Sequence, residues 1–168
     1  MCNDSLFVDF RDQKIHGHYT LVKEISEKEG STKLDINLAD RTKMNNADYY
    51  PWPIIKDSIN LNDGLVFISE RLKKETIMSG SFSGELKVTI NKKDFDFAVN
   101  LYELTADGKY FHLSNYIGRA SFAKNREQRE LLTPYKPTTI GFDNTSIIFK
   151  KIAKGSRIVV VINTNKNP

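Results

Sequence analysis

Two carboxylates, Asp94 and Asp96, stand two positions apart and are the first candidates for chemistry in this sequence. In an extended strand, side chains at i and i+2 project from the same face, about 7 Å apart. Carboxylates at that distance could act as an acid–base pair or share a Ca²⁺ ion. Because Lys92, Lys93 and Arg119 supply cations nearby, we interpret Asp94, Asp96 and Arg119 as structural charged pairs, with a metal or catalytic site as the alternative.

Histidines offer a second kind of chemistry. His16 and His18 would share one face of a strand, where they could chelate a metal or supply a general base. A third ligand close by in the sequence is missing, which favours a polar strand edge instead. His112 lies in a predicted hairpin, where we expect a half-buried packing residue.

An aromatic loop is the best candidate for contact with another molecule. Tyr49, Tyr50 and Trp52 lie in the segment Tyr49-Tyr50-Pro51-Trp52-Pro53. Proline stiffens this loop, and exposed aromatic rings on a stiff loop can bind sugars, acyl groups or protein surfaces at low entropic cost. The alternative is that the rings fold back and cover one end of the domain.

The sequence motifs of common enzymes are missing. There is no Gly-x-Ser-x-Gly elbow, no Gly-rich phosphate loop, no His-Glu-x-x-His and no Cys-x-x-Cys. We therefore predict no catalytic residue, no cofactor and no metal ligand for this chain.

Composition narrows the class of protein further. The 168 residues carry a net charge of +4, and the 25 basic residues are interleaved with 21 acidic ones. Nucleic-acid binding is not expected, because no concentrated basic stripe is present. No apolar run approaches the roughly 20 residues of a membrane span, so no membrane partner is expected either. Cys2, the one cysteine, leaves the compartment undecided.

The elements that must position these residues are strands. Alternating patterns predict half-buried strands over Thr32–Asp40, Glu85–Asn91 and Phe95–Leu101, the last with Asp94, Asp96 and Asn100 on its polar face. Continuous apolar runs at 65–68 and 157–162 predict strands covered on both faces. Ala106-Asp107-Gly108 predicts a hairpin turn between 99–104 and 109–113, and Ser79-Gly80 and Ser83-Gly84 are typical of turns as well. Residues 123–132 lack an apolar stripe, which predicts an excursion with at most one helical turn. Many short strands favour a sandwich or barrel.

Three linked motifs over 65–168 resemble a known family. The first is the strand Leu65–Leu72 with Ser69-Glu70, followed by Ser79-Gly80. The second is Asp94-Phe95-Asp96-Phe97, leading to Asp107-Gly108 and Gly118-Arg119. The third runs from Phe149 through Gly155 and Arg157 to the Asn-rich end at Pro168. Together they resemble the C-terminal non-catalytic domain of the cocaine-esterase-like and X-prolyl dipeptidyl-peptidase hydrolases, which include cephalosporin acylases and α-amino-acid ester hydrolases.

This resemblance implies an all-β jelly-roll sandwich similar to galactose-binding domains. In the family it is fused behind an α/β-hydrolase domain that holds a Ser–Asp–His triad, which is absent here. We expect residues 1–64 to be the connecting segment, with edge strands and the aromatic loop, and 65–168 to be the jelly roll, in a single compact domain overall. Both ends of the chain look cut, and the last strands of the jelly roll are expected to be missing.

The expected role is that of an accessory domain, which hydrolyses nothing alone. It would support the catalytic domain and its acyl pocket, which the aromatic loop would line in part. It would also support the contacts of a homo-oligomer. A carbohydrate-binding module that uses Tyr49, Tyr50 and Trp52 is the alternative.

Overall fold

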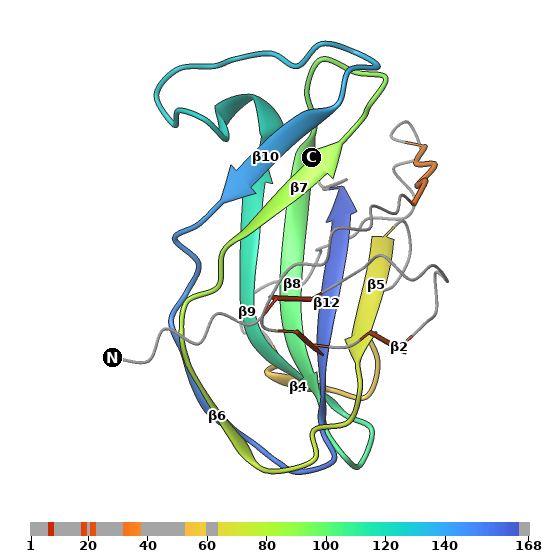
Figure 1. Ribbon diagram of the computed structural model, residues 1–168, viewed down its shortest axis with the longest axis vertical. Helices are drawn as coiled ribbons and strands as arrows, with labels where there is room; N and C mark the ends of the chain where they lie inside the picture. The colour runs from red at the N-terminus through yellow and green to blue at the C-terminus, as the bar shows by residue number, and fades with distance from the viewer. Residues whose placement is uncertain are drawn as a thin grey trace.

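The computed structural model of the protein describes residues 32–37, 53–59 and 64–164, together with the backbone of three two-residue strands nearer the N-terminus. One short 3₁₀ helix is present among these residues, and the other elements are strands (Figure 1). Their bounds are β1 Phe7–Val8, β2 His18–Tyr19, β3 Leu21–Val22, β4 Ile55–Lys56, β5 Gly64–Ser69, β6 Thr76–Gly80, β7 Gly84–Val88, β8 Asp96–Leu104, β9 Tyr110–Arg119, η1 Ala120–Phe122, β10 Thr138–Phe142, β11 Ile148–Ile152 and β12 Arg157–Thr164.

The largest unit is a six-stranded sheet in the order β2-β5-β12-β8-β9-β4. Its strands are antiparallel except for the β2–β5 pair. Strands β12 and β8 lie in the middle, and both are buried on both faces. This is what the apolar run 157–162 predicts. The expectation of a half-buried β8 is wrong, because Ala98, Asn100 and Tyr102 on its presumed polar face are buried as well.

The predicted hairpin is formed by β8 and β9, which pair from Asp96↔Arg119 to Leu104↔Tyr110. Its turn is closed by the bond from the Thr105 N–H to the Lys109 carbonyl, 2.8 Å long. Gly108 has φ +87°, a left-handed conformation that glycine adopts without strain. The hairpin therefore brings the start of β8 beside the end of β9.

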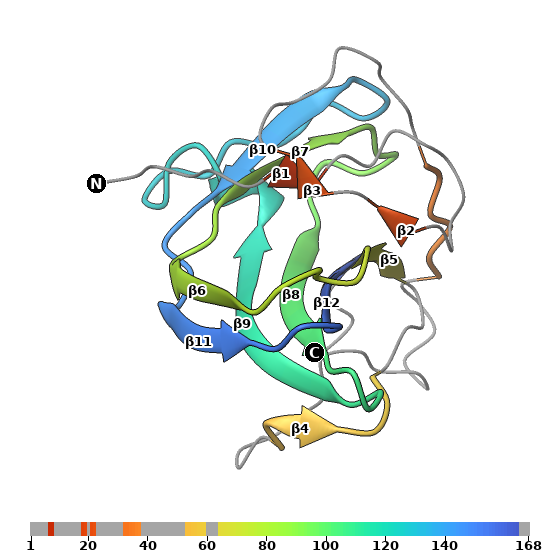
Figure 2. The same ribbon diagram turned by 60° about the horizontal axis from the view of Figure 1, so that its bottom comes forward.

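A second unit is a long two-stranded ribbon that lies across the six-stranded sheet (Figures 1 and 2). One half pairs β6 with β11, from Thr76↔Ile152 to Gly80↔Ile148. The other half pairs β7 with β10, from Gly84↔Phe142 to Val88↔Thr138. Between the halves, residues 81–83 face the longer segment 143–147, and the ribbon bends there.

The glycines near this bend do not make the turns that their sequence suggests. Gly80, with φ +122°, ends β6, and Gly84 begins β7, so the chain continues along the ribbon. A Cβ on Gly84 would lie 2.6 Å from the ring of Phe142, its cross-strand partner. Gly84 therefore allows that ring to lie flat against the backbone.

The core fills the space between ribbon and sheet. Phe97 and Val99 of β8 pack with Ile140 and Phe142 of β10, and a second group joins Leu101 to Ile148 of β11. The Phe97 ring lies 5.6 Å from Tyr116 and 6.3 Å from Phe142 between centroids; such aromatic pairs contribute about 0.5–1.5 kcal/mol each beyond area burial. On the opposite face of the sheet, Tyr102 packs with Val159 and Val161.

Three further predictions concern the rest of the fold. A strand over Thr32–Asp40 is wrong for the described residues 32–37, which form no strand. Leu34 is exposed there, so the alternating pattern has no core to face. The excursion is confirmed: after η1, irregular chain continues to β10. The all-β sandwich is confirmed too, whereas the jelly-roll strand order and the likeness to galactose-binding domains remain predictions.

Candidate functional site

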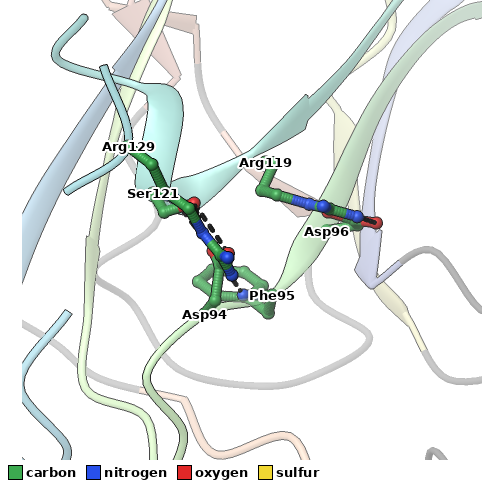
Figure 3. A network of polar contacts seen from close by, with 6 residues as sticks. All are labelled: Asp94, Phe95, Asp96, Arg119, Ser121 and Arg129. Carbon is green, nitrogen blue, oxygen red and sulfur yellow. Dashed lines mark hydrogen bonds and ion pairs between the residues drawn. The ribbon is translucent and has the colours of Figure 1, made fainter. Parts of the chain in front are cut away.

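Asp94 is the centre of a polar network at the base of the β8–β9 hairpin (Figure 3). Its Oδ1 accepts hydrogen bonds from the backbone N–H groups of Phe95 and Ser121, both 3.0 Å long. Its Oδ2 accepts from the Ser121 hydroxyl at 2.6 Å and from Nη2 of Arg129 at 2.9 Å. The side chain is 16% exposed. These four bonds use the acceptor capacity of the carboxylate.

The protonation of Asp94 follows from these contacts. Burial alone would raise the pKa of Asp94, but the hydrogen bonds from Ser121, Arg129 and the two backbone N–H groups outweigh it and leave the pKa below its ordinary value. A carboxylate with a lowered pKa and no free lone pair is a poor general base and a poor metal ligand. The geometry therefore favours a structural role for Asp94, whose carboxylate anchors Ser121 and Arg129 to the start of β8.

Asp96 has a different partner. It lies directly opposite Arg119 in the β8–β9 register. Nε of Arg119 donates to Oδ1 at 2.6 Å, and Nη2 donates to Oδ2 at 2.9 Å. This bidentate pair raises the pKa of Arg119 further above its ordinary value, so Arg119 stays charged. The two carboxylates therefore hold two separate cations, Arg129 and Arg119, rather than facing a common site.

The network joins three segments that are distant in sequence. Asp94 precedes β8, Ser121 lies in η1, and Arg129 belongs to the excursion before β10. Backbone bonds reinforce it, from the Glu130 N–H to the Ser121 carbonyl and from the Leu132 N–H to the Lys93 carbonyl. Sequence reasoning missed Ser121 and Arg129, since the charged excursion has no periodicity that would indicate which side chain turns inward.

A second polar group, also missed, lies under the ribbon. Glu103 of β8 is buried, yet it carries a carboxylate. The Ser156 hydroxyl donates to its Oε1 at 2.7 Å, and Nζ of Lys150 from β11 lies 3.1 Å from its Oε2. Nζ of Lys150 also lies 4.1 Å from the ring centroid of Phe111. A buried charge is tolerated only with such partners, and here they connect the ribbon to the sheet.

The remaining predicted candidates are only partly visible. Tyr49, Tyr50 and Trp52 lie outside the described residues, as does His16. His18 is described only as backbone in β2. His112 is half-buried, and its ring centroid lies 5.4 Å from that of Tyr102, in agreement with a packing role.

Two features are absent from the residues that the structure describes. No group of three or more His, Cys, Asp or Glu side chains is placed so that it could hold a metal ion. No helix there has the length and apolar character required to cross a membrane.

Comparison with known proteins decides the family. Residues 9–168 match the family described as the X-Pro dipeptidyl-peptidase C-terminal non-catalytic domain. The chain belongs to this family. No curated protein is significantly similar to it in sequence. The family match confirms the resemblance drawn from the three linked motifs, and the domain is a non-catalytic one.

Solved structures share the fold of this X-Pro dipeptidyl-peptidase C-terminal domain. An α-amino acid ester hydrolase superposes with a TM-score of 0.74 at 16% identity, over 98% of this chain and 29% of its own. A CocE/NonD family hydrolase from Staphylococcus aureus gives 0.54 at 12% identity, over 94% and 28%. An aminopeptidase from a marine sediment Thaumarchaeota archaeon gives 0.59 at 22% identity, over 63% and 19%. The chain thus spans less than a third of each of these proteins.

Proposed function

We propose that this chain is the C-terminal accessory domain of a larger serine hydrolase acting on ester, amide or X-prolyl peptide bonds. The observation that carries the proposal is the match of residues 9–168 to a non-catalytic domain that is named for such a peptidase. The similar folds in an ester hydrolase and an aminopeptidase, each several times longer, support it.

The polar groups of the domain support a mechanical role. The carboxylates of Asp94, Asp96 and Glu103 are each held by a cation or a hydroxyl. Charges used in this way fix the arrangement of strands rather than supply reactive groups. A rigid sheet and ribbon could support the catalytic domain and its substrate pocket without taking part in the reaction.

Finer roles follow from the sequence. We propose that residues 1–64 lead from the catalytic domain into the sheet, to which they add the edge strands β2 and β4, and that Tyr49, Tyr50 and Trp52 contribute to an acyl pocket at this junction. Homo-oligomer contacts of the intact enzyme are part of the same proposal. Aromatic side chains suit both tasks, since they bury large apolar area with few rotatable bonds.

The experiment that tests this proposal is to read the gene upstream of Met1. The expected result is a coding segment in the same frame with a Gly-x-Ser-x-Gly elbow followed by an aspartate and a histidine. An upstream frame without a hydrolase domain would overturn the proposal.

A further inference from the structure

The outer face of the β6–β11 half of the ribbon is unusually apolar. Ile77 of β6 is 66% exposed, Phe149 of β11 is 83% exposed, and Ile147, directly before β11, is 82% exposed. Alternation along the strands places Ile77 and Phe149 on the same side, away from the buried Ile148 and Ile152, and the exposed Ile147 is two positions before Phe149. Scattered exposed apolar residues are normal, but three large ones on one small face mark a surface for contact. We call Ile77, Ile147 and Phe149 the ribbon patch.

The register of the ribbon brings these side chains together. Ser79 lies opposite Phe149, and Ile77 lies opposite Lys151, so Ile77 and Phe149 are diagonal neighbours. Diagonal side chains on one face of an antiparallel pair lie about 7–8 Å apart, within reach of an aromatic ring. The ribbon patch is therefore continuous rather than a set of isolated side chains.

The inner side of this half is fixed to the domain. Met78 and Ile148 pack on the core, and Lys150 lies beside Glu103. The patch is thus presented on a preorganised surface, and binding there costs little ordering of the backbone. Figure 2 shows β6 and β11 on the outside of the molecule, in front of β8 and β9.

The charged residue opposite Ile77 in the ribbon is paired. Lys151, the cross-strand neighbour of Ile77, has its Nζ 2.8 Å from Oε1 of Glu75. This pair therefore adds no net charge beside Ile77 that would select an anionic or a cationic ligand. An apolar protein surface fits it best.

We infer that the ribbon patch packs against the catalytic domain of the same polypeptide; this rests on the proposed function. The length of chain beyond the matched region favours this occupant, since the match covers only 29% of the ester hydrolase. The remainder of such a protein is tethered to this domain, which raises its effective concentration at the patch. Of the described surface, the ribbon patch has the largest and most exposed apolar side chains gathered on one face.

Thiol accessibility tests the inference. Phe149→Cys is made in the 168-residue chain and in the longest natural polypeptide that contains it, and labelling with a maleimide is followed at that site by peptide mass spectrometry. Ile55→Cys, on β4 and 54% exposed in the wild type, is the matched control. The expected result is at least tenfold slower labelling of the Phe149→Cys site in the full-length protein, with an unchanged rate for Ile55→Cys.

Three outcomes would contradict this placement. Equal labelling of Phe149→Cys in both proteins overturns it, as does equal protection of the two sites. Protection in the short chain that grows with protein concentration would assign the patch to a second copy. If the full-length protein is an active hydrolase and its patch is still open, this inference alone fails and the proposed function stands. Ile147→Cys replaces Phe149→Cys if that variant loses its thermal unfolding transition.

Discussion

The hydroxyl of Thr145 forms hydrogen bonds with both backbone polar groups of Phe82, across the bend of the ribbon. Its Oγ1 accepts from the Phe82 N–H at 2.8 Å and donates to the Phe82 carbonyl at 2.7 Å. Residues 81–83 and 143–147 belong to no strand, so ladder bonds are interrupted there. One buried side chain thus replaces a cross-strand pair, which lets the two halves of the ribbon change direction without leaving Phe82 unsatisfied.

Replacement of Thr145 by valine should therefore destabilise the domain. Valine has a similar shape but leaves the N–H and carbonyl of Phe82 without this partner, at a cost of about 1–3 kcal/mol. Urea unfolding measures the loss. Thr145→Ser keeps the hydroxyl and should retain most of the stability, so equal losses in the two variants would contradict the bridging role.

Asp94→Asn should destabilise the domain more than Asp96→Asn. An amide keeps one acceptor oxygen but directs an NH₂ group toward the Ser121 hydroxyl and Arg129, so we expect a loss of about 2–4 kcal/mol. The Asp96–Arg119 pair is more exposed, with side chains 31% and 51% accessible, and its loss should cost about 1 kcal/mol or less. Chemical denaturation of both variants at pH 7 compares them. A larger loss for Asp96→Asn would contradict the anchoring role of Asp94.

The lowered pKa of Asp94 predicts a pH dependence of stability. In the unfolded chain the carboxyl has its ordinary pKa near 3.9, and in the folded domain the pKa is lower. The unfolded state therefore binds the proton first as the pH falls, and the contribution of Asp94, complete well above pH 4, is lost as the pH falls through the folded value.

Unfolding free energies of the wild type and Asp94→Asn at pH 7, 5 and 3 give the measurement. The gap between the two proteins should be similar at pH 7 and 5 and smaller at pH 3. A gap that is unchanged at pH 3 would contradict the assignment of the charge to Asp94.

Neighbouring lysines on β11 should differ in importance. Lys150→Met keeps the packing against Phe111 but leaves the Glu103 carboxylate buried without its cation, at a cost of about 3 kcal/mol. Lys151→Met removes only an exposed pair with Glu75 and should cost about 1 kcal/mol or less. Thermal or urea unfolding separates the two, and Glu103→Gln in the Lys150→Met background should recover part of the loss. Equal effects of the two lysine variants would contradict the buried pair.

The fold could be predicted from the sequence wherever periodicity coincides with burial. The runs 157–162 and 65–68 and the Asp107-Gly108 turn identify central strands and a hairpin, since each pattern depends on local geometry. The strand expected over Thr32–Asp40 is wrong for residues 32–37. An alternating pattern indicates which side chains would share a face, but it does not show whether a neighbouring strand is available for pairing. The bend of the ribbon was not predictable either, since Ser79-Gly80 and Ser83-Gly84 look like turns when the pairing with β10 and β11 is unknown.

The candidate site could be predicted only in part. Asp94, Asp96 and Arg119 stand out by residue type and spacing, but the partner of Asp94 is Arg129, 35 positions away. Long-range contacts of this kind depend on how η1 and the excursion pack, which no local pattern encodes. Glu103 was overlooked for a similar reason, since a single acidic residue near a hairpin end looks solvated until Lys150 and Ser156 are placed beside it.

The most direct test of the central claim is labelling with a fluorophosphonate, which reacts with activated serines, combined with an ester hydrolysis assay. We expect the 168-residue chain to be neither labelled nor active, and the full-length polypeptide to be labelled at a serine upstream of Met1 and to hydrolyse the ester. Labelling at any serine within residues 1–168, with turnover lost when that serine is changed to alanine, would contradict a non-catalytic role for this domain.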